Sequence, residues 1–179
     1  MLSFRISISN HTLYNYKKIN HLRGEAVRRK DKEITDISLV EKILREAEII
    51  RIAMVDGDMP YLVAMNYAYA DGAIFMHSAK EGRKINILKK NNKVAFQVDK
   101  DVELLLEKEA CRCGTKYLSV FGTGTAFFIS DYEGEKAALD AIMTRYLGRS
   151  GFSYPDEVMN RTLVIKVEID TITGKKSGY

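Results

Sequence analysis

The sequence predicts a mainly β (α+β) fold, in which an antiparallel sheet is flanked by helices. Two observations lead to this prediction. Short β-rich segments follow one another through residues 49–78, and the pairs Asp56-Gly57 and Asp71-Gly72 separate them at the spacing of hairpin turns. Strands joined by such tight turns run antiparallel, which rules against a parallel βαβ array. An antiparallel sheet usually removes its exposed edges by closing into a barrel.

The first elements are placed in order from these signals. Residues 1–26 have weak periodicity and are expected to form an N-terminal extension to a domain spanning residues 27–179. A helix is predicted over 38–48, because Ser38 and Glu41 match a capping box and apolar residues follow at helical spacing. The strands of a three-stranded meander are then predicted at 49–55, 61–69 and 73–78.

The second half of the chain alternates between helices and longer strands. A second capping-box match, Ser130 to Glu133, predicts a helix that continues to residue 147. Gly122 and Gly124 fall inside a predicted strand, where a glycine often marks a bulge or a close backbone approach. The other predicted segments are a helix at 82–91, strands at 93–99, 117–129 and 160–170, and a loop at 100–116 with a short helical piece at 103–109.

Composition and charge narrow the classes of function. The chain has 179 residues, which suits one domain or one domain with a short extension. Its net charge of +4 and pI near 8.9 fit a small anionic ligand or no charged ligand at all. It has no long basic stripe with interleaved aromatic residues, so no nucleic-acid partner is expected. No apolar run approaches the roughly 18 residues of a membrane span, and residues 1–20 lack the apolar core of a signal peptide. We therefore expect a cytoplasmic protein that spans no membrane.

The two cysteines, Cys111 and Cys113, are spaced as C-x-C. They are too few for a disulfide framework, and the three histidines lie far from them in the sequence, so no metal site is expected. We interpret the cysteines as reduced thiols in a loop, in keeping with a reducing cytoplasm.

The segment from Phe75 to Lys84 carries the strongest chemical signal. A predicted strand ends near Ser78, a tight loop follows, and a predicted helix begins near Gly82 with Arg83 and the lysine in its first turn. Basic residues there oppose the helix dipole, so they favour an anion at this position. A helix N-terminus, a hydroxyl, a guanidinium and an ammonium together suit a phosphate group. On the residues alone, a phosphate site and an ordinary surface loop are equally open.

The same segment resembles the phosphate-binding stretch of the flavin-binding split-barrel proteins, the pyridoxamine 5'-phosphate oxidase-like superfamily. The strand-end pair His77-Ser78 is followed six residues later by Arg83-Lys84, and the form His-Ser-Ala-x-x-Gly-x-Lys is similar to the nitroimidazole-resistance branch. The resemblance covers about residues 27–176 and implies an antiparallel Greek-key split β-barrel with flanking helices. Further similar motifs follow in the same order: Arg28-Arg29-Lys30-Asp31, Asn66-Tyr67, Tyr117-x-Ser119-Val120 with Gly122, and Thr173-Gly174-Lys175.

The resemblance implies a cofactor-binding role for individual residues. It implies that Ser78, Arg83 and Lys84 hold the flavin phosphate. It also implies that one strand runs along the flavin ring and gives it backbone hydrogen bonds. The residues of that strand are Val63, Ala64, Met65 and Asn66.

The resemblance further implies that His77 lies close to the cofactor and is the catalytic residue. Its ordinary pKa near 6.5 suits a proton donor or a hydrogen-bond partner of the acceptor. Gln97 and Ser119 are implied to reach the flavin from a neighbouring strand or subunit. The sequence shows no Ser-His-Asp or Cys-His arrangement, and flavin chemistry requires none.

The implied function is a flavin-dependent oxidoreductase with FMN, or alternatively FAD, as its cofactor. It would take electrons from a donor such as a reduced nicotinamide and pass them to a small acceptor such as a nitro-aromatic 5-nitroimidazole. The resemblance implies a homodimer with the cofactor at the subunit interface. Two alternatives are a flavin- or haem-binding carrier or sensor without turnover, and a true pyridoxamine 5'-phosphate oxidase. The latter is disfavoured because the chain contains no tryptophan, and hence no substrate-clamping Trp and Arg pair near its end.

Overall fold

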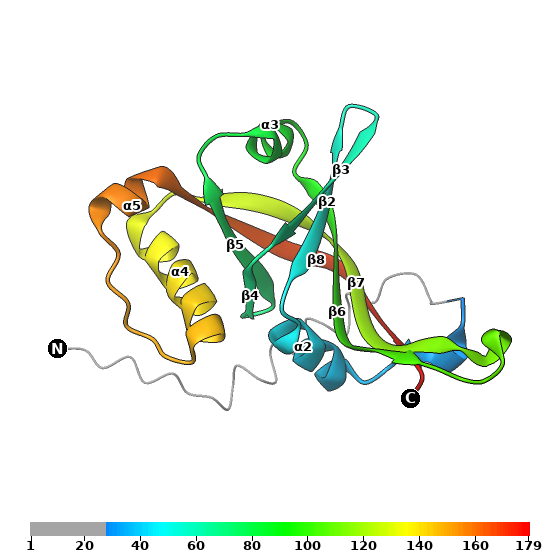
Figure 1. The fold of residues 1–179 in the computed structure, drawn as a ribbon. Helices are drawn as coiled ribbons and strands as arrows, with labels where there is room; N and C mark the ends of the chain where they lie inside the picture. Colours follow the sequence, from blue (N-terminus) through cyan, green and yellow to red (C-terminus); the bar gives the residue numbers. More distant parts are fainter. Residues whose placement is uncertain (1–27) are drawn as a thin grey trace.

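The structure is a computed structural model that describes residues 28–179, so the predicted extension at residues 1–26 lies outside the described residues. In the described part of the chain, eight strands form one sheet with four α-helices around it (Figure 1). The strands are β1 (Glu33–Ile34), β2 (Ile50–Asp56), β3 (Met59–Met65), β4 (Tyr67–Ala70), β5 (Ala73–Ala79), β6 (Lys93–Leu105), β7 (Gly114–Ile129) and β8 (Thr162–Ser177). The helices are α2 (Ile37–Glu46), α3 (Arg83–Lys90), α4 (Tyr132–Leu147) and α5 (Asp156–Arg161), with 3-10 turns η1 (Lys30–Lys32) and η2 (Ala110–Arg112).

The sheet is a split barrel, as predicted. Its hydrogen-bonded order is β3-β2-β6-β7-β8-β5-β4, with β1 added beside β8, and every pair is antiparallel. β3 and β4 follow each other in the chain with only Asn66 between them, yet they stand at opposite ends of this order. The curled sheet therefore brings its two edges together at Asn66 without pairing them. The predicted strand at 61–69 is thus divided in two.

The two helices predicted from capping boxes exist, but each is capped by a different residue from the one predicted. Asp36, not Ser38, caps α2, and its carboxylate accepts a hydrogen bond from the serine N–H at 2.9 Å. Asp131, not Ser130, caps α4 and accepts from the N–H of Gly134 at 2.7 Å. An aspartate is as good an N-cap as a serine, and its charge also complements the helix dipole.

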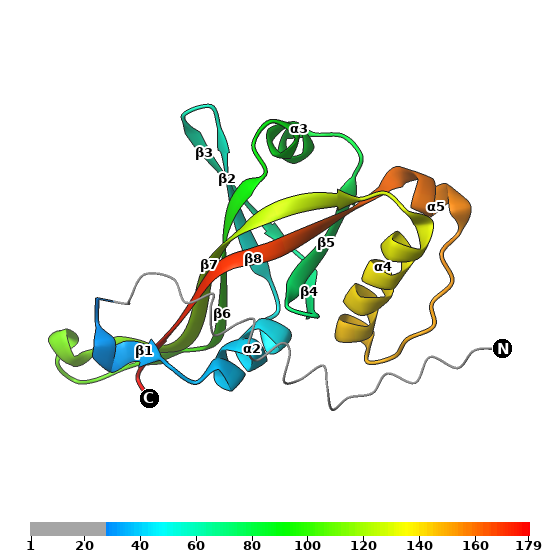
Figure 2. The same cartoon turned by 180° about the vertical axis from the view of Figure 1, so that it is seen from behind.

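The largest difference from the predicted secondary structure lies in residues 100–116. The predicted loop with a helical piece is wrong: β6 continues to Leu105 and pairs with β7 from Gly114 onward. The two strands form an arm that extends away from α4 in both views (Figures 1 and 2). Cys111 and Cys113 lie at the tip of this arm, exposed and unpaired with each other. The structure also adds α5, which no sequence signal was used to predict.

The glycines inside β7 mark a close backbone approach, as predicted. A Cβ on Gly122 would collide with the Phe96 ring, and a Cβ on Gly124 would collide with the backbone of Glu168. The β7–β8 register also shifts between Thr123 and Gly124, which is the irregularity expected of a bulge. The lack of a side chain at these two positions lets β7 lie close to both β6 and β8. No helix within residues 28–179 is long and apolar enough to cross a membrane.

Candidate functional site

The N-terminus of α3 has hydrogen-bond donors and a positive charge that nothing in the described chain balances. Gly82 precedes the helix at φ 122°, a conformation that favours glycine, and no side chain caps the first N–H groups. The Lys84 ammonium contacts the Met65 sulfur of β3 at 3.5 Å and forms no ion pair with a described carboxylate. Burial lowers the pKa of Lys84. Half-buried Ser78 is the next-to-last residue of β5, the strand that precedes α3, so a phosphate here would meet N–H groups, a hydroxyl and a cation.

Arg83 lies in the same turn but points elsewhere. Its guanidinium forms an ion pair with Asp56 at 3.1 Å and lies over the Tyr61 ring, 4.6 Å from the centroid. Both partners belong to the β2–β3 hairpin. A ligand phosphate would therefore compete with the Asp56 carboxylate for Arg83. The sequence motif gave no sign of this acidic partner, which lies 27 residues earlier in the chain.

His77 precedes Ser78 on β5, and its imidazole is accessible to solvent. Partial burial lowers the pKa of His77 below its ordinary value, and the nearby positive charge of Lys84 lowers it further. The lowered pKa favours the neutral form of the imidazole, which has one donor and one acceptor nitrogen. Lys84 contacts the Met65 sulfur, and its charge lowers the pKa of His77, so these three predicted residues lie close to one another.

The predicted ring-binding strand is the edge strand β3. It pairs with β2 on one side, and no other described strand pairs with it on the other side. Val63 and Met65 are cross-strand neighbours of buried Ile52 and Ile50 and so face the inside of the barrel, whereas Ala64 and Asn66 are exposed. The free edge offers backbone N–H and C=O groups to a ligand. This is the property that backbone hydrogen bonds to a ring require.

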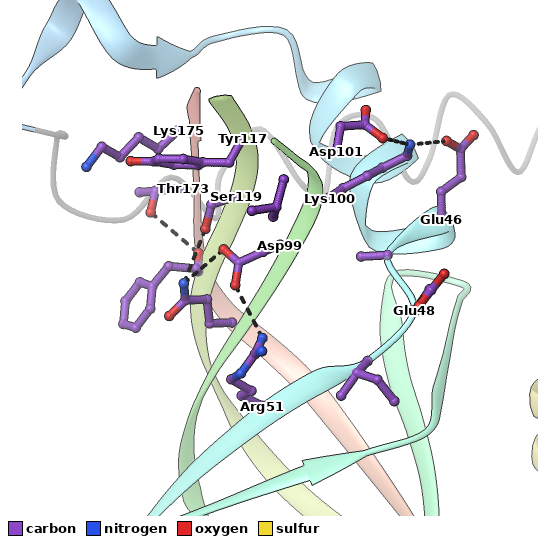
Figure 3. Close-up of a pocket in the computed structure, with 15 residues that line it drawn as sticks. Glu46, Glu48, Arg51, Asp99, Lys100, Asp101, Tyr117, Ser119, Thr173 and Lys175 are labelled. Carbon is purple, nitrogen blue, oxygen red and sulfur yellow. Dashed lines mark hydrogen bonds and ion pairs between the residues drawn. The ribbon is translucent and has the colours of Figure 1, made fainter. Parts of the chain in front are cut away.

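Gln97 and Ser119 lie in an open pocket of about 1050 Å³ on the outer face of the sheet (Figure 3). The Gln97 amide donates to the Asp99 carboxylate at 3.1 Å and to the Ser119 hydroxyl at 3.5 Å. Arg51 holds the same carboxylate at 3.2 Å. These contacts fix the amide group on the floor of the pocket. Arg51 and Tyr117, which also line the pocket, were not predicted as site residues.

The structure thus gathers the predicted residues into two groups. One group surrounds the N-terminus of α3, and the other lies in the pocket, whose lining contains no residue of the first group. A row of cross-strand neighbours on the outer face of the sheet links the two groups: Ala64 of β3 pairs with Arg51 of β2, and Arg51 pairs with Gln97 of β6. Within this chain, the row places two strand spacings, roughly 10 Å, between Ala64 and Gln97.

The described chain thus forms a split barrel with an uncompensated positive charge beside the free edge of β3. The chain belongs to the pyridoxamine 5'-phosphate oxidase family, whose model matches residues 36–176. This confirms the family to which the sequence motifs pointed. A search of curated proteins found no match.

Several solved structures share this fold. One is a proposed 5-nitroimidazole antibiotic resistance protein from Bacteroides thetaiotaomicron, with 32% sequence identity, a TM-score of 0.72, and coverage of 80% of this chain and 86% of that chain. Two others have 17% identity and a TM-score of 0.72. The FAD and haem binding protein from Mycobacterium smegmatis covers 83% of this chain and 74% of its own. The flavocytochrome Anf3 from Azotobacter vinelandii covers 86% and 73%. At 17% identity these two show a common fold alone.

Proposed function

We propose that this protein binds FMN, or alternatively FAD, at the N-terminus of α3 and along the free edge of β3. The carrying observation is the uncompensated Lys84 beside an unpaired strand edge. A flavin nucleotide has the two matching parts, an anionic phosphate and a planar ring whose rim carries hydrogen-bond donors and acceptors. Ser78, Lys84 and the helix N–H groups would hold the phosphate, with Arg83 released from Asp56 to join them. The backbone from Val63 to Asn66 would hold the ring.

We further propose that the functional unit is a homodimer with one cofactor at each interface site. The outer face of the sheet exposes apolar side chains, including Leu62 at 61% and Phe121 at 49%. Exposed apolar patches of this kind are typical of interaction surfaces. A second copy lying on this face would bring its own Gln97 and Ser119 toward the β3 edge of the first copy. Two-fold symmetry would then build both sites at once.

The proposed activity is that of an oxidoreductase acting on small acceptors such as nitro-aromatic compounds. When bound, the flavin supplies electron transfer from a donor such as a reduced nicotinamide to the acceptor. His77, whose lowered pKa favours the neutral imidazole, would donate a hydrogen bond to the acceptor and orient it. The 32% identity to the proposed 5-nitroimidazole antibiotic resistance protein supports nitroimidazoles as acceptors and resistance to them as a role.

A second candidate is a flavin- or haem-binding carrier or sensor without turnover. It is favoured by the fold shared with the FAD and haem binding protein from Mycobacterium smegmatis. Oxidation of pyridoxamine 5'-phosphate itself is opposed by the lack of any tryptophan in the chain.

One series of measurements on the purified protein tests these proposals. We expect a flavin absorbance spectrum, or uptake of added FMN, at one flavin per protomer of a dimer in analytical ultracentrifugation. Under anaerobic conditions a reduced nicotinamide should bleach the flavin, and a 5-nitroimidazole should restore its colour. Flavin binding without bleaching would favour the carrier, and a protein that takes up no flavin would refute the cofactor proposal.

A further inference from the structure

The pocket on the outer face has two chemically different ends (Figure 3). At one end, the Lys100 ammonium lies 3.6 Å from Glu46 and 2.6 Å from Asp101, so its charge is compensated. Arg51, on the floor, is likewise paired with Asp99. A further anion would gain little at these positions, because each cation already has a carboxylate partner.

The other end holds a cation without such a partner. The Lys175 ammonium forms no ion pair with any described carboxylate, and it lies 5.9 Å from the centroid of the Tyr117 ring. Glu33 is its cross-strand neighbour on β1, but the two side chains do not meet as an ion pair. The Ser119 hydroxyl, on the adjacent strand, accepts from Gln97 and leaves its own hydrogen free to donate. This end therefore offers one positive charge and one donor to an anionic group.

Aromatic rings also line this pocket. The Tyr117 ring lies alongside Lys175 in the close-up, and the Phe121 ring, 49% exposed, lines the same pocket. Flat apolar surfaces of this kind favour a planar aromatic ligand, which stacks on them or packs against their edges. The volume of about 1050 Å³ is at the upper end for small-molecule sites, so a small ring fills only part of the pocket.

We propose that this end of the pocket is a binding subsite for a small aromatic carboxylate. The carboxylate binds the Lys175 ammonium and the Ser119 hydroxyl, and the ring lies against Tyr117 and Phe121. A neutral ring of the same shape makes the ring contacts but lacks the charge that Lys175 attracts, so the subsite selects for the charge. The subsite rests on the proposed function in one respect: the molecule held there is the electron acceptor, which makes nitro-aromatic acids the preferred acceptor class.

Benzoate and benzamide form a matched pair of probes, because they have the same shape and differ in charge. NMR titration of the wild-type protein, with and without added FMN, should give an affinity for benzoate about ten-fold higher than for benzamide. Lys175→Met should abolish this preference. Lys176→Met removes the same charge from the next residue of β8, which faces the other side of the sheet and does not line the pocket, and should leave the preference unchanged.

Two further measurements separate the possible failures. Added salt should weaken binding of benzoate and spare benzamide, since the selectivity is electrostatic. With flavin bound, Lys175→Met should raise the KM for 4-nitrobenzoate, with kcat and the KM for 4-nitrobenzamide unchanged. Equal binding of the two probes, or a preference that survives Lys175→Met, would overturn the subsite. Absence of flavin uptake in the same samples would refute the proposed function, while the benzoate preference would still report on the subsite.

Discussion

Replacing Lys84 with methionine removes the one charge at the N-terminus of α3 that no described carboxylate balances. Methionine keeps much of the length and packing of the lysine stem, so the change acts mainly on charge. A hydrogen bond from a charged group contributes about 1.5–3 kcal/mol. If Lys84 holds the flavin phosphate, its loss should weaken FMN binding by about 10- to 100-fold. The helix N–H groups and Ser78 remain, so binding should be weakened rather than abolished.

Riboflavin is the comparison that isolates the phosphate, because it carries the same ring without the phosphate group. Quenching of flavin fluorescence on titration with protein measures both affinities. Lys84→Met should lower the affinity for FMN and leave riboflavin within about two-fold of wild type. Lys89→Met, an exposed charge in the last turn of the same helix, should change neither affinity. An equal loss for FMN and riboflavin would refute a phosphate role, since the substitution would then act through the fold or the ring site.

Three further predictions concern electrostatics and stability. Inorganic phosphate should raise the pKa of His77 toward its ordinary value in an NMR titration, because an anion beside Lys84 offsets the charge that helps to lower it; an unmoved pKa would place the anion elsewhere. Tyr67→Phe should lower the free energy of unfolding in urea by about 1–3 kcal/mol, because the Tyr67 hydroxyl donates at 2.6 Å to the Leu44 carbonyl in the last turn of α2. Tyr132→Phe, at an exposed site, should leave the free energy of unfolding unchanged. Gly122→Ala should lower the free energy of unfolding by about 1–3 kcal/mol, because the added Cβ meets the packed Phe96 ring. Gly114→Ala adds its Cβ in open space and should leave the free energy of unfolding unchanged.

Local sequence signals predicted most elements, and they failed where long-range pairing decides the structure. Residues 102–106 are apolar except for Glu103, and such a short segment suits a helix or a strand equally well. The pairing of Leu105 with Gly114 makes it a strand, and nothing within the run itself indicates that partner. α5 is a different case. Pro155 followed by Asp156 and Glu157 is a helix-start signal that the sequence contains and that reading by apolar periodicity passed over.

The candidate site divides in the same way. The strand-loop-helix turn that carries the phosphate motif was predictable, because Ser78 and Lys84 are close in sequence. The pocket was not, because Arg51, Tyr117 and Lys175 come from three strands. Strand register alone brings them to one face, and one residue of slip would turn each of them inward. The sequence pattern of a strand indicates which of its residues share one face of the sheet. The order of strands in the sheet decides which residues of different strands lie next to one another on that face.

The Asp56–Arg83 ion pair makes the strength of phosphate binding a competition that the sequence motif alone does not reveal. The pair is exposed and joins its partners at 3.1 Å, so it is worth at most about 1 kcal/mol. Asp56→Asn releases Arg83 and removes a negative charge near the phosphate, and FMN affinity should therefore rise by about two- to five-fold in the same fluorescence titration. Riboflavin affinity should not change. Asp58→Asn, at an exposed residue of the same hairpin, should leave FMN affinity at the wild-type value. Weaker FMN binding in Asp56→Asn would mean that the carboxylate holds Arg83 in the position from which it contacts the phosphate, and that the two residues act together rather than in competition.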